Sequence, residues 1–130
     1  MDFIMNENGF QTSVEFGELH ISSQDEYGFR PYVLLVSSVV GCSGSILKKI
    51  LQKMRIPFKD IHVSVDVVRN QKEANRIEEM DIKFIIYGED ISPVKVEKAL
   101  VLTTKYCSII QSIKDSIKIT ERFEIISNQE

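Results

Sequence analysis

The sequence predicts an α+β fold in which mainly antiparallel sheets pack around one long central helix. Alternation of apolar and polar residues comes in successive pairs of segments, over 10–22 and again over 61–87. Strands that follow each other without an intervening helix form hairpins, which pair antiparallel. Between the pairs, the segment 32–54 is apolar enough for a buried helix. The length of 130 residues, with 43% hydrophobic and 27% charged residues, suits a single domain over 1–130.

The first thirty residues are predicted to form two strands and a loop. Apolar side chains alternate with polar ones over 10–16 and over 19–22, and Gly17-Glu18 supplies a tight turn between them. The polar segment 24–28 is predicted to be a loop that leads into the long helix.

The long helix is predicted over Tyr32–Met54. Pro31 precedes it, and proline suits a first helical turn because its missing N–H would have no partner there. Pro57 ends the element. Small residues crowd its middle from Gly41 to Ser45, and we expect them to let another backbone come close. A helix this apolar has more surface than one small sheet can cover, so we expect an intertwined homodimer.

The rest of the chain is predicted to be a hairpin, two helices and a closing strand. Strands over 61–68 and 77–87 flank a polar hairpin tip at 70–75. Ser92 is the expected N-cap of a second helix that begins at Pro93, with its inward residues at Val96, Leu100 and Thr103 or Thr104. A short helix over 108–115 follows Cys107, and alternation over 117–125 predicts the final strand.

Composition and charge exclude several classes of function. The net charge of −3 argues against nucleic acid as a partner, because phosphate binding needs a clustered basic surface. We interpret the basic residues at 48–55 as the solvated face of the long helix. The N-terminus lacks the pattern of a signal sequence, and the longest apolar run, 32–40, is too short to span a bilayer. A cytoplasmic protein without a membrane partner is expected.

The two cysteines, Cys42 and Cys107, are the main candidates for chemistry. In a reducing compartment they are not expected to form a permanent bridge, so they are either packed small residues or redox groups. Their spacing, with two unpaired histidines elsewhere, does not predict a metal site, and no cofactor is expected. Small residues beside Cys42 leave room for an oxidant, and Lys105 would lower the pKa of Cys107 if the two adjacent side chains faced each other.

Two pairs of segments resemble the OsmC/Ohr family. Arg30–Leu35 followed by Val39–Gly44 is similar to the family's central helix, which has a Pro, a Leu-rich turn, small residues and then Gly-Cys-Thr/Ser-Gly. Ser92–Leu100 followed by Tyr106–Ile109 is similar to the family's second site, where a helix delivers a second Cys. The order and spacing of these motifs agree with the family from about Phe10 to Ile126.

The resemblance implies an intertwined homodimer that reduces organic hydroperoxides at its dimer interface. Cys42 would be the peroxidatic cysteine that attacks a small organic peroxide or related electrophile. Cys107 would resolve the sulfenic acid as a disulfide, and a dithiol reductant would restore both thiols.

The sequence departs from the family where the first cysteine is usually activated. Active members carry a Glu just after the Pro, where this chain has Tyr32 and Val33, and an Arg from the N-terminal strands, where this chain has none. A thiol with the unperturbed pKa of ~8.5 is mostly protonated at neutral pH and is a slow peroxidase. Arg30 and Tyr32 are the candidates to replace the missing pair. The alternative is a non-catalytic, dimeric binding or stress-response protein whose cysteines are merely packed.

Overall fold

The computed structural model describes residues 1–127 and confirms the predicted α+β class. The chain divides into two compact units, Met1–Ser38 and a second unit that begins at Val39. The first contains β1 (Ile4–Asn6), β2 (Gly9–Ser13), β3 (Glu18–Ile21) and the start of α1 (Pro31–Lys53). The second contains the rest of α1 and then β4 (Phe58–Asn70), β5 (Arg76–Gly88), α2 (Pro93–Tyr106), α3 (Ser108–Ile113) and β6 (Lys118–Ile126). The prediction of one domain over 1–130 stays a prediction.

The N-terminal unit is a small antiparallel sheet in the order β1-β2-β3. β2 is shorter than predicted, because Val14 and Gly17 exchange backbone hydrogen bonds of 3.0 and 3.1 Å and so close the turn early. β1 was not predicted, because its short apolar run does not alternate with polar residues. Gly9 is required by close packing, since a Cβ there would lie 2.0 Å from the Ile21 carbonyl oxygen.

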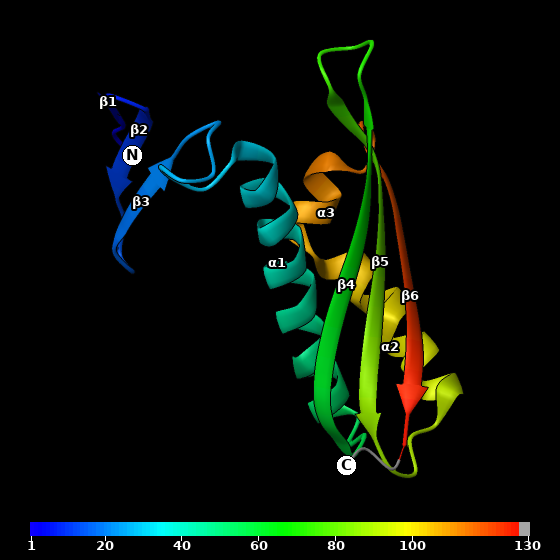
Figure 1. Ribbon diagram of the computed structural model, residues 1–130. Helices are drawn as coiled ribbons and strands as arrows, with labels where there is room; N and C mark the ends of the chain where they lie inside the picture. The colour runs from blue at the N-terminus through cyan, green and yellow to red at the C-terminus, as the bar shows by residue number, and fades with distance from the viewer. Residues whose placement is uncertain (128–130) are drawn as a thin grey trace. The chain divides into compact units, whose positions relative to one another are not determined.

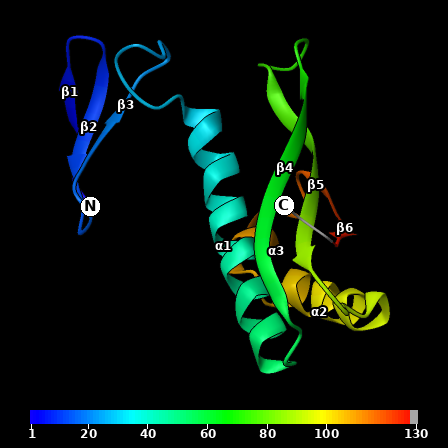
Figure 2. The same ribbon diagram turned by 60° about the horizontal axis from the view of Figure 1, so that its bottom comes forward.

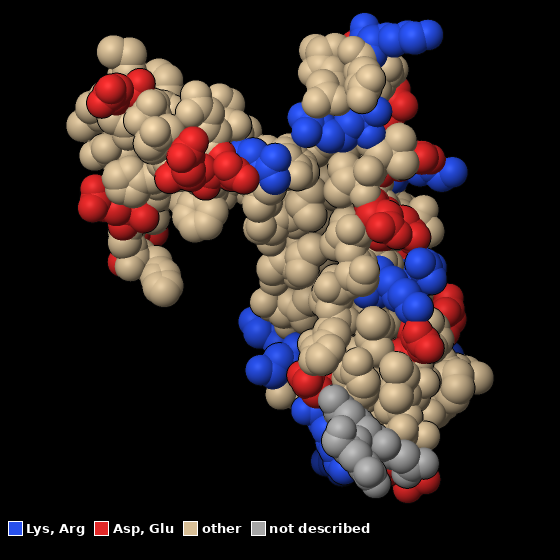
Figure 3. Space-filling model, in the orientation of Figure 1, with Lys and Arg blue, Asp and Glu red and all other residues tan. Residues whose placement is uncertain are grey.

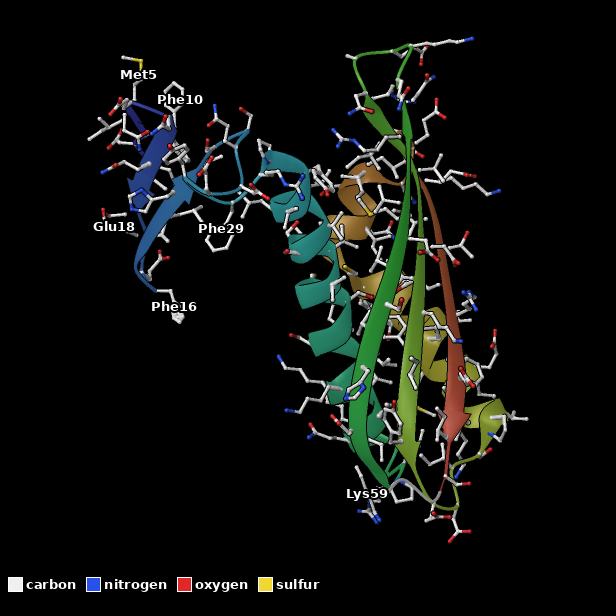
Figure 4. All side chains as sticks on the ribbon, in the orientation of Figure 1. Met5, Phe10, Phe16, Glu18, Phe29 and Lys59 are labelled. Carbon is white, nitrogen blue, oxygen red and sulfur yellow. The ribbon has the colours of Figure 1, made fainter. Side chains whose placement is uncertain are left out.

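The strands of this unit bury polar side chains and expose apolar ones. Thr12 and Ser22 are buried, and each donates a 2.7 Å hydrogen bond to a backbone carbonyl, of Asp2 and Asn8 respectively. In Figure 4 the side chain of Phe16 points away from the strands, and it is 93% exposed. The other exposed large apolar residues of β1 to β3 and their loops are Phe3, Ile4, Met5, Phe10, Val14, Tyr27 and Phe29. A sheet with its apolar side chains in water lacks a core.

Helix α1 begins at Pro31, one residue before the predicted start, and buries one narrow stripe. Its fully buried positions, Val39, Ser43, Leu47 and Leu51, recur every four residues. The small residues Gly41 and Gly44 have no neighbouring atom within 4 Å of an added Cβ, so no other backbone of the described chain comes close there. By length and apolar composition α1 would be able to cross a membrane, and it is the one such helix among residues 1–127. One such helix is weak evidence, since the core helices of soluble proteins pass the same test.

The second unit is a three-stranded sheet in the order β4-β5-β6, with helices on one face (Figures 1 and 2). β4 and β5 form the predicted antiparallel hairpin, with its tip at the predicted loop. β6 pairs in parallel with β5, so the sheet is mixed rather than wholly antiparallel. Parallel pairing follows from the connection, because α2 and α3 return the chain to the starting end of β5.

The core of this unit lies between the sheet and the helices. Alternate residues of β5, from Met80 to Ile86, are buried, and Phe84 is the largest of the fully buried side chains. Helix α2 contributes the predicted Val96, Leu100 and Thr103. Ser92 caps α2 as predicted, since its Oγ accepts a hydrogen bond from the N–H of Lys95 at 3.4 Å. The buried Thr103 places the end of α2 against this core.

Candidate active site at Cys42 and Cys107

Each cysteine is placed by a different element of the second unit. Cys42 lies in α1 and is half-buried, next to the fully buried Ser43 of the helix stripe. Cys107 is the single residue between α2 and α3, and it is fully buried. Its N–H donates to the Thr103 carbonyl and its own carbonyl accepts from the Gln111 N–H, both at 3.0 Å. Cys107 is therefore held at both backbone groups, as the prediction of a junction residue requires.

The structure brings the two thiols together at the start of α3. The Cys42 Sγ lies 3.9 Å from the Ser108 hydroxyl oxygen, and the Cys107 side chain is also within hydrogen-bonding reach of it. Cys107 is the N-cap of α3 but makes no side-chain cap hydrogen bond. The first N–H groups of a helix have no partner inside the helix. Those of Ser108 and Ile109 act on the Cys42 sulfur, and those of Ile109 and Ile110 act on the Cys107 sulfur.

These donors lower the pKa of Cys42. The largest effect is a hydrogen bond from the Ile109 N–H, followed by one from the Cys107 thiol, while burial opposes both. The hydroxyl and the N–H of Ser108 add smaller contributions in the same direction. All of these groups stabilise negative charge on sulfur, because each donates a hydrogen bond to the thiolate. The fold thus supplies donors where the sequence lacks the usual Glu and Arg.

The environment of Cys107 acts in the opposite direction. The pKa of Cys107 is raised to about 11, chiefly by burial, and Cys42 contributes to the rise through its hydrogen bond and its charge, while the N–H groups of Ile110 and Ile109 oppose it. The prediction that Lys105 lowers this pKa is wrong, because the Lys105 ammonium lies over the exposed Tyr106 ring, 5.4 Å from its centroid. Cys42 is therefore the thiol of this pair that ionises first, and Cys107 stays protonated and donates a hydrogen bond to it.

Arg30 and Tyr32 interact with each other in the N-terminal unit. The Arg30 Nη2 donates to the Tyr32 hydroxyl at 3.2 Å, and its guanidinium carbon lies 5.0 Å from the ring centroid. This places Arg30 as an exposed residue beside the start of α1. Their predicted role in activating Cys42 stays a prediction.

A third group of side chains at this site was not predicted. Glu121 of β6 accepts a hydrogen bond from Ser43 Oγ at 2.6 Å and another from Thr104 Oγ1 at 2.5 Å. In the alternation of β6, Glu121 lies on the same face of the strand as Ile119 and Phe123. This face is turned towards the helices. A carboxylate in the apolar phase of a strand is the sequence signal that would have found it.

The remaining candidates lie away from the cysteines. His20 and His62 are exposed, and His62 lies 2.9 Å from the Asp60 carboxylate. Blue side chains gather along the end of α1 in Figure 3, where Lys48, Lys49 and Lys53 are exposed as predicted. No three His, Cys, Asp or Glu side chains among residues 1–127 lie close enough to hold a metal ion.

A shallow apolar groove lies one helical turn beyond Cys42, between α1 and α2. Its volume is about 270 Å³. Its lining is mostly apolar and is formed by Ile46, Ile50, Leu102 and Tyr106. Lys49 and Lys53 of α1 complete it. Ile46 follows Cys42 by four residues and Tyr106 precedes Cys107, so the groove borders the elements that carry both cysteines.

Solved structures similar to this chain cover nearly its whole length. A hypothetical protein from Aquifex aeolicus VF5 is 28% identical, with a TM-score of 0.87 over 98% of this chain and 96% of the other. An OsmC-like protein from Mycoplasma pneumoniae shares 13% identity, with a TM-score of 0.83 over 96% and 94% of the chains. An organic hydroperoxide resistance protein from Elizabethkingia anophelis, with thiocyanate bound, also shares 13%, with a TM-score of 0.76 over 96% and 94%.

The family of this chain is shown by a match to a family model. A search of functionally curated proteins found no significant match. The family model described as OsmC-like protein matches residues 23–122, which include α1, both cysteines and Glu121. With the order of its elements and its contacting pair of cysteines, this chain belongs to the family of OsmC-like proteins.

Proposed function

We propose that this protein is a thiol-dependent reductase of organic hydroperoxides, with Cys42 as the peroxidatic and Cys107 as the resolving cysteine. The observation that carries the proposal is the contact between two thiols whose pKa values are shifted in opposite directions. A peroxidatic cysteine must react as the thiolate. A resolving cysteine must lie near the peroxidatic cysteine and remain protonated until that cysteine has been oxidised.

The chemistry follows from this division. The Cys42 thiolate attacks the terminal oxygen of the hydroperoxide, the O–O bond breaks, and the alkoxide takes a proton from the solvent and leaves as an alcohol, so that Cys42 becomes a sulfenic acid. The Cys107 sulfur then attacks the Cys42 sulfur, and its proton leaves with the displaced hydroxide as water. An external dithiol supplies the two electrons that reduce the resulting disulfide. Once Cys42 is a neutral sulfenic acid, its charge no longer raises the pKa of Cys107.

Two further observations support an organic peroxide as the substrate. The apolar groove beside Cys42 offers an apolar surface for an organic substituent, which hydrogen peroxide lacks. The similar structure from Elizabethkingia anophelis is named an organic hydroperoxide resistance protein. Free thiols at both positions agree with a protein that works in the reducing cytoplasm.

We also propose that the protein acts as a homodimer. The exposed apolar residues of β1 to β3 need a partner surface, as do the half-buried apolar residues of α1. Residues 1–29 contain six acidic residues and no Lys or Arg, whereas the end of α1 is basic. This charge complementarity favours packing of the N-terminal unit of one copy on a second copy. A monomeric mass by light scattering at micromolar concentration would exclude the dimer.

The test of the activity uses cysteine variants and a small organic hydroperoxide with a dithiol reductant. Cys42→Ser is expected to abolish dithiol-supported peroxide consumption. Cys107→Ser is expected to stop turnover after one equivalent and to accumulate the Cys42 sulfenic acid, which a dimedone probe traps.

The same assay distinguishes an active enzyme from the alternative, a non-catalytic member of the family. The absence of the usual Glu and Arg favours this alternative. Such a protein would show equal, background peroxide consumption in the wild type and in both variants. Ser112→Ala, an exposed change in α3, is the matched control and is expected to behave as the wild type.

A further inference from the structure

One carboxylate joins α1, which contains Cys42, to α2, which ends directly before Cys107. Ser43 and Thr104 each donate to a different oxygen of Glu121, at 2.6 and 2.5 Å. Ser43 follows Cys42 directly in α1, and Thr104 lies near the end of α2, one turn before Cys107. Each cysteine is therefore linked, through its own helix, to one end of the same side chain on β6.

The position is an unusual one for a carboxylate. Glu121 pairs with the buried Ile82 across the parallel ladder and lies between Ile119 and Phe123 on the same face of β6. An apolar side chain at this place would avoid the cost of desolvating a charge. Short hydrogen bonds from hydroxyl groups to a carboxylate are strong and directional. The contacts of Glu121 therefore tie α1 and α2 to the same side chain of β6.

We propose that Glu121 is a positioning residue that sets the separation and orientation of the Cys42 and Cys107 sulfur atoms. The inference rests on the proposed function of these cysteines as a redox pair. Disulfide formation accepts only a narrow range of Cα–Cα distances and torsion angles. Because Glu121 connects α1 to α2, it controls how often the two sulfurs meet in the geometry that closes the bond.

The test measures disulfide closure without peroxide. Diamide, an azo oxidant, accepts two electrons and two protons from the two thiols while the S–S bond forms, and quenched samples are analysed by mass spectrometry. We expect Glu121→Ala to slow closure by at least about tenfold, since it removes two hydrogen bonds to a charged group and each of them shifts an equilibrium by about that factor. Ser43→Ala and Thr104→Val remove one link each, and each is expected to slow closure several-fold.

Two variants distinguish positioning from a general loss of stability. Thr104→Ser keeps the hydroxyl and is expected to close at nearly the wild-type rate, unlike Thr104→Val. Glu124→Gln removes an exposed carboxylate of the same strand, which pairs with Lys83 at 2.7 Å, and is expected to have no effect on closure. Thermal unfolding of every variant is recorded beside the closure rate.

Wild-type closure rates in a folded Glu121→Ala variant would overturn the proposal. If that variant does not fold, Thr104→Val and Thr104→Ser decide, and equal rates for these two would overturn it. Because diamide oxidises thiols in any protein, slowed closure with no peroxide consumption by the wild type would leave this inference standing and remove the proposed function.

Discussion

The two cysteines lie in contact, yet their surroundings differ in burial and in hydrogen bonding. Cys42 is half-buried and receives hydrogen bonds from the backbone at the start of α3 and from the other thiol. Cys107 is fully buried between α2 and α3, where burial is the main influence on it. Hydrogen-bond donors outweigh burial at the Cys42 sulfur and burial outweighs them at the Cys107 sulfur, so the two pKa values are shifted apart. The difference shows how a fold can assign separate roles to identical side chains without a charged activator.

The largest expected effect is on the relative reactivity of the two thiols. At pH 8 iodoacetamide should alkylate Cys42 at least ~100-fold faster than Cys107, because alkylation requires an accessible thiolate. Peptide mass spectrometry of samples quenched at successive times measures both rates in one experiment. Equal rates, or faster alkylation of Cys107, would break the contrast between the two sites.

A second effect concerns stability at high pH. The pKa of Cys107 is raised in the folded state to about 11, so the unfolded chain loses its proton first as the pH rises. The resulting contribution to stability is complete below the ordinary thiol pKa and is lost as the pH rises through about 11. We expect this loss to amount to about 3 kcal/mol.

Urea unfolding under reducing conditions at pH 8 and above pH 11 measures the effect. Working in a Cys42→Ser background removes the coupling between the thiols. The further replacement Cys107→Ala is the control, because it removes the titrating group while other groups titrate as before. An identical pH dependence with and without the Cys107 thiol would show that burial does not hold its proton.

The smallest effect is expected at Ser108. Ser108→Ala removes a hydroxyl 3.9 Å from the Cys42 sulfur, a long contact, and should slow alkylation of Cys42 at neutral pH about twofold. Ser108→Pro also removes the N–H, and proline is tolerated at a first helical position, so this variant should be somewhat slower. Alkylation rates of Cys42 that fall in the order wild type, Ser108→Ala, Ser108→Pro would support the assignment of the Ser108 hydroxyl and N–H as donors. The reverse order would contradict it.

Much of the second unit could be predicted from the sequence. Alternation over 61–87 and 117–125 predicted β4, β5 and β6, because a strand with one buried face has a period of two. Ser92-Pro93 predicted the start of α2 through ordinary capping chemistry. The closeness of Cys42 and Cys107 was implied only by the resemblance, since residues so far apart in sequence meet through packing.

Other features depend on tertiary structure and have no local signal. The alternation of β6 fixes which face is buried but not its neighbour or direction, so the parallel pairing with β5 was missed. Glu121 could be noticed as a carboxylate in an apolar phase, but its partners lie on two distant helices. The donors to Cys42 include backbone N–H groups, which every sequence contains, and only the placement of α3 makes them available.

The central claim is that the fold stabilises the Cys42 thiolate although the usual Glu and Arg are absent. The most direct test is the pH dependence of Cys42 alkylation in the native wild type, resolved by mass spectrometry and compared with the same cysteine in urea. We predict that the apparent pKa of Cys42 is lower in the folded protein than in the unfolded chain, as its hydrogen bonds require. A native value equal to or above the unfolded one would contradict the claim.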